Sequence, residues 1–372
     1  MAGEVIKPDL RFVNDLIGSG GETLKKCYQC ATCSVVCKVT PDSRPFPRKE
    51  MVYAQWGLKD RIISNPDVWL CHNCNDCTKY CPRGARPGDV LSTVRQKFIE
   101  ENSIPSVMGK IVTQPKMTII ALLLPVILFL IILGSTGHLG IPEGDIVYSK
   151  MFPISYIEIT FFIAVGLAGL SYLASLTRFW NSMTRINGKS YSKGFGAALT
   201  ETIMEFLKHS RFEKCGPNAD RKTGHMLIFY AFVGLFITTL WITYYYYVPK
   251  IHSPIPLSDP MKWLANISAI ALLVGSLMII SNRMKDKGFV SKTSSFDWTF
   301  ITIILILGIT GFLTELIRLA GIATLAYPMY FIHLVFVFYT IVYFPYSKLA
   351  HMGYRTLAIT YSKMTGRDIR LE

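Results

Sequence analysis

Cysteine is almost missing from this sequence after residue 81. Of nine cysteines in 372 residues, eight lie in two tight groups before residue 82, and only Cys215 lies beyond them. So uneven a distribution in a long chain argues against a disulfide framework and favours metal binding. We expect the isolated Cys215 to be a plain thiol.

Long apolar runs are missing from the amino-terminal part of the chain. Residues 1–24 contain no apolar core of the length that a secretory signal peptide needs. We therefore expect the cysteine-rich segment to stay in the reducing cytoplasm. Apolar residues make up 51% of the sequence, and their long runs begin only after Lys116.

Six runs after Lys116 are long and apolar enough to be membrane-spanning helices. They are Met117–Leu133, Ile154–Thr177, Met226–Val248, Trp263–Ser281, Trp298–Ile317 and Ala326–Phe344. The expected fold class is all-α, with an N-terminal helical domain at 1–110, a six-helix membrane bundle at 111–360 and a cytoplasmic tail at 361–372.

Acidic residues are scarce, with 25 Asp and Glu against 39 Lys and Arg, and the net charge is +14. Such a charge can indicate nucleic-acid binding, but its distribution argues against a nucleic-acid partner. The connections 178–224, 282–297 and 348–372 carry nine, four and five Lys or Arg. The opposite connections carry only Lys150, Lys250, Lys262 and Arg318. The positive-inside rule then places both chain ends on the cytoplasmic side of the cytoplasmic membrane.

The connection between the second and third apolar runs contains the sequence "AALTETIMEFLKHSRF". Its apolar residues recur at helical spacing, which is typical of an amphipathic helix. We expect this helix to lie on the inner membrane surface or beneath a partner.

The two cysteine groups, "CYQCATCSVVC" and "CHNCNDCTKYCP", share the spacing C-x2-C-x2-C-x3-C. Three cysteines on a tight loop ligate one cluster, whereas the fourth ligates the other cluster. The spacing therefore predicts two 4Fe–4S clusters with crossed ligation. The first set is Cys27, Cys30, Cys33 and Cys81, and the second is Cys71, Cys74, Cys77 and Cys37. A pair of zinc sites is the alternative, although zinc does not require the third and fourth cysteines at these spacings.

The segment between the cysteine groups includes "RKEMVYAQWGLKDRII", which has a helical pattern. With the eight cysteines, residues 20–100 resemble the helical ferredoxin module of fumarate reductase iron–sulfur subunits. They also resemble the small iron–sulfur subunit of heterodisulfide reductase.

Histidines occupy both ends of the apolar stretch "HLVFVFYTIVYFPYSKLAH". As one continuous helix, this stretch would place His333 and His351 on one face, about 27 Å apart along the axis. His351 would then end the sixth helix at the inner face, where His225 begins the third. Two imidazoles at one level suit a six-coordinate heme b. His333 would lie in the outer leaflet.

This stretch, with "GHMLIFYAFVGLF" and "ITGFLTELIR", resembles the gamma subunit of respiratory nitrate reductase and the cytochrome b subunit of heterodisulfide reductase over residues 150–360. In that family, the histidines matching His225 and His351 bind the inner heme b. The histidine matching His333 binds an outer heme with a second histidine on the third helix, where this chain has Leu235. Either His138 or His252 completes the outer site, or that heme is absent, and we expect two hemes.

A two-cluster ferredoxin fused to such a cytochrome resembles the membrane-subunit family of quinone-interacting membrane-bound oxidoreductase complexes. This resemblance implies menaquinol as electron donor, soluble flavin- and iron–sulfur-containing partner subunits, and adenylylsulfate reductase as the eventual acceptor. One alternative is a heterodisulfide-reductase-like membrane subunit with a different soluble acceptor. Another is a structural membrane anchor of a redox complex.

Three charged residues are candidates for a quinone site near the level of His333. Glu158 lies near the outer start of the second apolar run, and Glu315 and Arg318 lie near the outer end of the fifth. Carboxylates at this depth usually accept protons or neutralise a neighbour. The alternative is that Glu315 and Arg318 form an ion pair within one helix and have no redox role.

Overall fold

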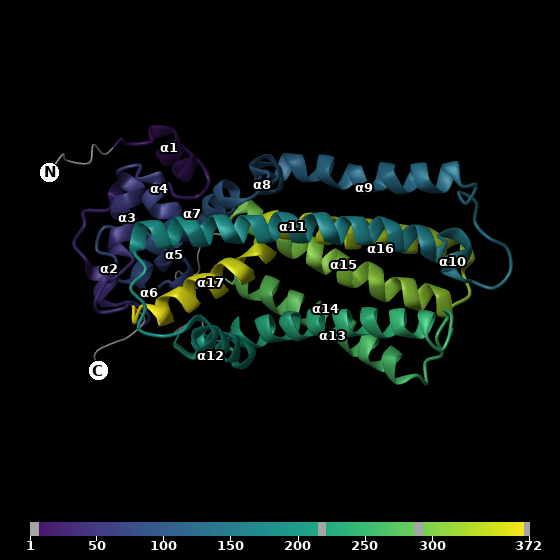
Figure 1. Ribbon diagram of the computed structural model, residues 1–372. Coiled ribbons are helices and arrows are strands. Elements are labelled where there is room, and N and C mark those ends of the chain that lie inside the picture. The colour runs from purple at the N-terminus through teal and green to yellow at the C-terminus, as the bar shows by residue number, and fades with distance from the viewer. Residues whose placement is uncertain (1–6, 215–220, 286–292, 368–372) are drawn as a thin grey trace.

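The described part of the molecule is helical throughout. The computed structural model describes residues 7–214, 221–285 and 293–367, and no strand occurs among them. The expected plain thiol Cys215 lies outside the described residues. In Figure 1, the short N-terminal helices gather at one end of an elongated molecule, and a bundle of long helices forms the rest. The expected all-α fold with two parts is confirmed.

The N-terminal domain consists of short helices joined by loops that carry the cysteines. Its elements are α1 Leu10–Gly18, η1 Leu24–Lys26, α2 Thr32–Val35, α3 Arg48–Gln55, α4 Lys59–Ile63, α5 Asp67–Leu70, α6 Asp76–Lys79, α7 Pro87–Asn102 and α8 Ser106–Thr113. The helix expected between the cysteine groups is interrupted at Gly57, whose φ is +64°. A Cβ there would lie 2.7 Å from the carbonyl oxygen of Asp9, so glycine permits both the turn and this close approach.

Six helices have the length and composition needed to cross a membrane, as expected. They are α9 Pro115–Ser135, α11 Ile154–Asn187, α13 Arg221–Tyr247, α14 Pro260–Met284, α15 Ser295–Leu319 and α16 Ala323–Val342. The 34-residue α11 continues past Thr177, where its apolar run was expected to end. At about 1.5 Å per residue it exceeds the hydrocarbon core, so its last turns run beside the N-terminal domain (Figure 1).

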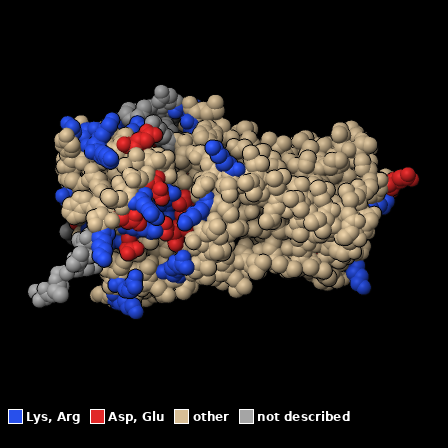
Figure 2. Space-filling model, turned by 90° about the horizontal axis from the view of Figure 1, so that it is seen from above, with Lys and Arg blue, Asp and Glu red and all other residues tan. Residues whose placement is uncertain are grey.

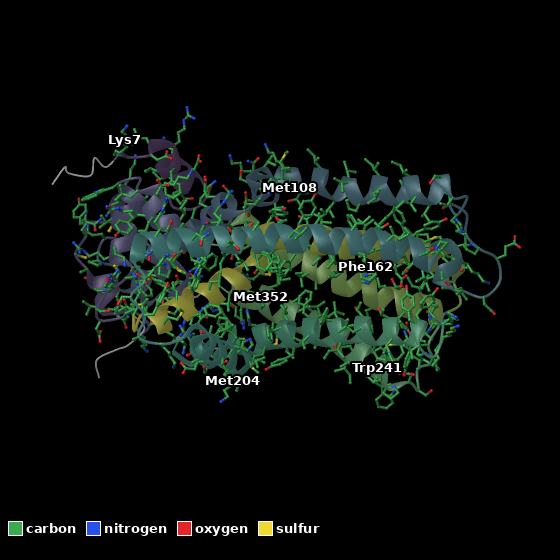
Figure 3. The ribbon with its side chains drawn as sticks, viewed as in Figure 1. Lys7, Met108, Phe162, Met204, Trp241 and Met352 are labelled. Carbon is green, nitrogen blue, oxygen red and sulfur yellow. The ribbon has the colours of Figure 1, made fainter. Side chains whose placement is uncertain are left out.

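The outward faces of these six helices are apolar. Ile119, Phe162 and Phe236 are each more than 60% exposed, which is unusual for large apolar side chains in a soluble protein. Figure 2 shows Lys, Arg, Asp and Glu gathered over the N-terminal domain and at the far tip, with a wide uncharged zone between them. Phe162, which Figure 3 labels, projects from α11 within this zone. A lipid environment would cover these side chains.

The sixth membrane helix ends earlier than expected. α16 stops at Val342 and is followed by η4 Phe344–Tyr346, η5 Lys348–Ala350 and the separate helix α17 His351–Met364. Pro345 explains the break, because proline has no N–H to donate and restricts the residue before it. The prediction of one continuous helix from His333 to His351 is therefore wrong. His351 begins α17, and the two histidines lie on different helices.

α17 packs between the N-terminal domain and the membrane bundle. It contacts α5, α11 and the amphipathic helix α12 Phe195–Lys208. Two short elements not yet named are α10 Tyr148–Met151 and η2 Ser210–Lys214. Figure 3 labels Met352 in the first turn of α17, at the junction of the two parts. Tyr361, Met364 and Arg367 are buried. The described part of the expected tail at 361–372 is thus packed into the protein.

A buried ion pair joins the end of this packed segment to the N-terminal domain. Arg367 donates from Nε to Asp67 Oδ1 at 2.9 Å and from Nη2 to Asp67 Oδ2 at 2.6 Å. Asp67 also accepts a hydrogen bond from Lys49. The bidentate geometry compensates for the loss of water around both charges.

Replacing Arg367 with Met should destabilise the protein, because the buried Asp67 carboxylate would keep only Lys49 as a charged partner. We expect a loss of about 3 kcal/mol or more in the free energy of unfolding. Urea unfolding of the purified protein in detergent measures this free energy. Lys193→Met is the control, because Lys193 pairs with the exposed Glu201 and should leave the urea midpoint unchanged. Equal midpoints for the two variants would contradict this role of Arg367.

Candidate metal centres

The eight clustered cysteines divide into two groups of four in the fold. Each group lines one small pocket and combines three cysteines of one sequence motif with the last cysteine of the other. The first pocket is lined by Cys27, Cys30, Cys33 and Cys81, and the second by Cys71, Cys74, Cys77 and Cys37. These are the two sets expected from the spacing.

The two cysteine loops have the same backbone conformation. In the first loop Gln29 and Ala31 have φ of +63° and +67°, and in the second Asn73 and Asn75 have φ of +56° and +69°. Left-handed conformations are uncommon outside glycine, so their recurrence two and four residues after the first cysteine indicates a shared constraint. They turn the chain so that the two cysteines of each loop converge with the third, which lies in the helix that follows, Cys33 in α2 and Cys77 in α6.

The thiols are held in surroundings that disfavour an isolated negative charge. Burial, together with the neighbouring Cys27, Cys30 and Cys81, raises the pKa of Cys33 to about 11. Burial likewise raises the pKa of Cys77 well above its ordinary value, with contributions from Cys71, Cys74 and Cys37. Positive metal ions bound between the sulfur atoms would offset both effects, so the donor set fits a metal cluster.

His225 and His351 come together at the end of the bundle that adjoins the N-terminal domain, and the sequence had predicted such a pair. Their ring centres lie 6.5 Å apart. Two imidazoles that bind one metal from opposite sides have centres about 6 Å apart, since each metal–nitrogen bond is about 2 Å. Burial lowers the pKa of His351 to about 4, so its ring is neutral at pH 7. The residues present therefore fit a heme.

Both rings have their Nδ1 atoms engaged. His225 Nδ1 lies 3.0 Å from His209 Nε2, and His351 Nδ1 is hydrogen-bonded to the carbonyl oxygen of Lys348. Such partners fix the orientation of a metal-binding imidazole and increase its basicity. The Nε2 atom of each ring is then the one available for a metal.

His209 was not predicted from the sequence as part of this site. It is buried, lies directly after α12 and has φ of +50°, which turns its ring toward α13. Burial lowers its pKa, so it too is neutral at pH 7. The available signal was a histidine at the end of the amphipathic stretch "AALTETIMEFLKHSRF", on the cytoplasmic side expected for His225.

The histidine pair shares one cavity with the second cysteine loop. His225, His351, Trp69, Cys71 and His72 all line this cavity. His72 is another residue that the sequence pattern did not single out. The second cysteine loop of the N-terminal domain and the histidine pair of the other domain therefore line the same cavity.

Two further contacts hold this junction together. Arg221, in the first turn of α13, donates from Nη2 to the carbonyl oxygens of His72 and Asn73, at 3.2 and 2.9 Å. Trp69 stacks on Tyr354 of α17 with ring centres 5.7 Å apart and planes 16° apart. The helices that carry the two histidines therefore both contact the second cysteine loop or the helix leading into it.

His333 is placed differently from the inner pair. Its Nδ1 lies 3.1 Å from Thr310 Oγ1, and its ring packs against Gly311 of α15. Leu235, for which the resemblance noted from the sequence would imply a histidine, packs in an apolar cluster with Ala231, Leu272 and Ile304.

The outer histidines expected as partners of His333 have other neighbours. His138 contacts Thr136 and Tyr156, and His252 contacts Tyr246 and is exposed. Within the described residues, neither ring is stacked on His333 or hydrogen-bonded to it, and the geometry does not fit a second heme with two histidine ligands.

The three charged candidates for a quinone site form two separate groups. Glu158 accepts a hydrogen bond from Tyr247 of α13. Glu315 pairs with Lys262 of α14 at 2.6 Å and with Arg318 at 3.2 Å, so the ion pair considered as an alternative does form. These carboxylates share no hydrogen-bond partner among the described residues.

Comparison with known proteins gives two family matches. Residues 23–85 match the 4Fe-4S dicluster domain, and residues 112–370 match the family described as Citrate utilization protein B. The first match favours iron–sulfur clusters over the zinc alternative. No solved structure matches the chain.

Several curated relatives resemble the N-terminal domain, and each match covers about a quarter of this chain. The C subunit of H(2):CoB-CoM heterodisulfide,ferredoxin reductase from Methanothermobacter marburgensis is 37% identical over 92 residues, which are 24% of this chain and 48% of the relative. A protein of Archaeoglobus profundus that is described as like the heterodisulfide reductase C subunit is 34% identical over 88 residues, covering 23% and 47%. The chain spans about half the length of the curated relatives it matches.

These matches agree with the fusion expected from the sequence. The N-terminal domain is an iron–sulfur domain of the type found in heterodisulfide reductase C subunits, followed by a domain with six apolar helices. The match to the family described as Citrate utilization protein B covers residues 112–370, which are more than half of the chain, so the chain belongs to this family.

Proposed function

We propose that this protein is the membrane subunit of a multisubunit oxidoreductase and connects a quinone in the membrane to soluble redox subunits. The proposal includes one heme b and two 4Fe–4S clusters. The observation that carries it is the cavity shared by His225, His351 and the Cys71 loop. Heme b and 4Fe–4S clusters each take up and release one electron at a time when bound.

The protein's part in this function is to hold and orient the cofactors. Cys27, Cys30, Cys33 and Cys81 would ligate the first cluster, and Cys71, Cys74, Cys77 and Cys37 the second. His225 and His351 would ligate the heme through Nε2, with His209 and the Lys348 carbonyl fixing their rings. Cys30 is exposed, so the first cluster site is the one open to a soluble partner.

The quinone would react at the outer end of the bundle. Glu158, Glu315 and Arg318 remain the candidates, and Tyr148 joins them because its hydroxyl donates to the Thr314 carbonyl oxygen at 2.6 Å. Burial raises the pKa of Tyr148 to about 12, which keeps this hydroxyl protonated. A quinol would lose protons on oxidation, and the two carboxylates are the groups placed to accept them.

The physiological assignment extends the resemblance noted from the sequence. Menaquinol would be the donor, flavin- and iron–sulfur-containing subunits would be the direct partners, and adenylylsulfate reductase would be the eventual acceptor. The protein would lie in the cytoplasmic membrane with both ends inside. A second heme at His333 is left out of the proposal, because the described histidines do not complete it.

A heterodisulfide-reductase-like subunit with another soluble acceptor is the second candidate. The matches of the N-terminal domain to heterodisulfide reductase C subunits favour it. Identification of the subunits that co-purify with this chain separates the two candidates. A purely structural anchor is the third alternative, and heme absorbance that changes on quinol addition would exclude it.

Alanine substitutions test the heme site. His225→Ala and His351→Ala should each remove the same single heme, because each removes one of the two imidazoles that would hold it. Pyridine hemochrome quantification of the purified complex measures heme content. His333→Ala is the matched control and should leave this content unchanged. Full heme content in His225→Ala would overturn the ligand assignment.

Serine substitutions test the crossed ligation of the clusters. Cys81→Ser should alter the same cluster signal as Cys33→Ser, and Cys37→Ser the same signal as Cys74→Ser. Electron paramagnetic resonance of the reduced protein distinguishes the two clusters. If Cys81→Ser altered the signal that Cys74→Ser alters, each cluster would instead be held within one motif.

Removing the hydrogen-bond partner of His225 should weaken heme binding without abolishing it. His209→Ala leaves His225 Nδ1 without its acceptor, so the ligand becomes less basic, and heme affinity should fall about tenfold. A less basic ligand also favours reduced iron, so the heme midpoint potential should rise. His209→Gln retains an acceptor and should behave more like the wild type. Unchanged affinity and potential in His209→Ala would show that the hydrogen bond has no such role.

A further inference from the structure

The cavity shared by the histidine pair and the Cys71 loop is strongly basic. Its charged lining among the described residues comprises five basic side chains and one carboxylate. These residues are Arg95, Arg221, Arg283, Lys348, Arg355 and Asp297. The five basic residues are half-buried, and charges withdrawn from water are costly unless they are paired, so this excess of one sign suggests an anionic group in the cavity.

The single carboxylate is already shared between two of the basic residues. Lys348 donates to Asp297 Oδ1, and Arg283 Nη1 lies 3.5 Å from Asp297 Oδ2. Asp297 therefore cannot also provide a close ion pair for every other cation in the cavity. A hydrogen-bond acceptor for Arg95 has to come from another group.

Arg95 has a buried nitrogen with no partner. Among the described residues, its Nη1 atom is shielded from solvent and makes no hydrogen bond. A buried donor left without an acceptor destabilises the protein, and the penalty is larger for a charged group. The cavity is also lined by the two histidines proposed to bind heme. The unpaired nitrogen of Arg95 therefore indicates that a molecule bound in this cavity supplies the hydrogen-bond acceptor.

Arg95 belongs to the iron–sulfur domain and not to the membrane bundle. It lies on α7, and it lines the same cavity as Lys348, Asp297 and His351. The residue therefore reaches the histidine pair from the opposite side of the domain junction. A ligand that bound Arg95 and both histidines would be held by the two domains together.

We propose that the Arg95 guanidinium binds a propionate carboxylate of the heme held by His225 and His351. This inference rests on the proposed heme site and adds the group that orients the heme within it. Guanidinium matches a carboxylate through two parallel hydrogen bonds, which lysine cannot reproduce. The iron–sulfur domain then takes part directly in heme binding.

Glutamine substitution tests the proposal in the purified full-length protein. Arg95→Gln should weaken heme binding by about tenfold or more, because a charge-assisted hydrogen bond is lost. The midpoint potential of the heme that remains should fall, since a nearby cation favours the reduced, more negative state. Arg95→Lys keeps the positive charge but not the two parallel hydrogen bonds. Its heme midpoint potential should therefore lie closer to that of the wild type than its heme affinity does. Arg11→Gln, at an exposed position of α1, is the control and should change neither value.

Heme dimethyl ester shows whether the propionate is the partner. Apo-protein prepared without heme would be reconstituted with protoheme or with its dimethyl ester, whose propionates carry no charge. The difference between wild type and Arg95→Gln should be present with protoheme and disappear with the ester. An equal difference with both hemes would overturn the proposal and assign Arg95 to another anion, such as a lipid phosphate.

The outcomes also separate this inference from the proposed function. If wild-type protein bound no heme, or if His225→Ala kept its heme, the heme site itself would be wrong. If those tests succeeded while Arg95→Gln bound protoheme with unchanged affinity and potential, the heme site would stand. Only the role of Arg95 would then be rejected.

Discussion

The packing of α17 against the iron–sulfur domain is the contact on which the rest of the structure depends. Trp69 stacks on Tyr354, and Arg367 forms a bidentate pair with the buried Asp67. Both partners on the domain side lie within four residues of Cys71. The same helix supplies His351 at its first position. One rigid junction therefore fixes the distance between the second cysteine loop and the histidine pair.

The charged and the apolar surfaces of the molecule lie on opposite sides of this junction. The six long helices expose apolar side chains, whereas charged residues gather over the iron–sulfur domain (Figure 2). The shared cavity lies where these two regions meet, and it is lined by basic residues from both. A low-dielectric boundary strengthens the electrostatic interactions formed there. An anionic ligand is thus favoured at the point where the two domains join.

Features set by local spacing could be predicted from the sequence, and features set by long-range packing could not. The cysteine motifs and the six apolar runs gave the all-α fold and the two thiol sets correctly. The break at Pro345 was missed because the stretch was judged by its apolar composition and its terminal histidines, although the proline was visible. The pairing of Asp67 with Arg367 joins residues 300 positions apart, and no local pattern indicates it. The hydrogen bond between His209 and His225 likewise depends on how α12 folds back onto α13.

The late position of α17 in the chain has a consequence for biogenesis. The helix supplies His351 and is followed directly by Arg367, so the ribosome must translate nearly all of the described residues before the cavity can close. The N-terminal domain and the first five membrane helices will have emerged by then. A nascent chain arrested before α17 would accordingly have neither His351 nor the contact between the two domains, so the cavity could bind a ligand only after α17 has been translated.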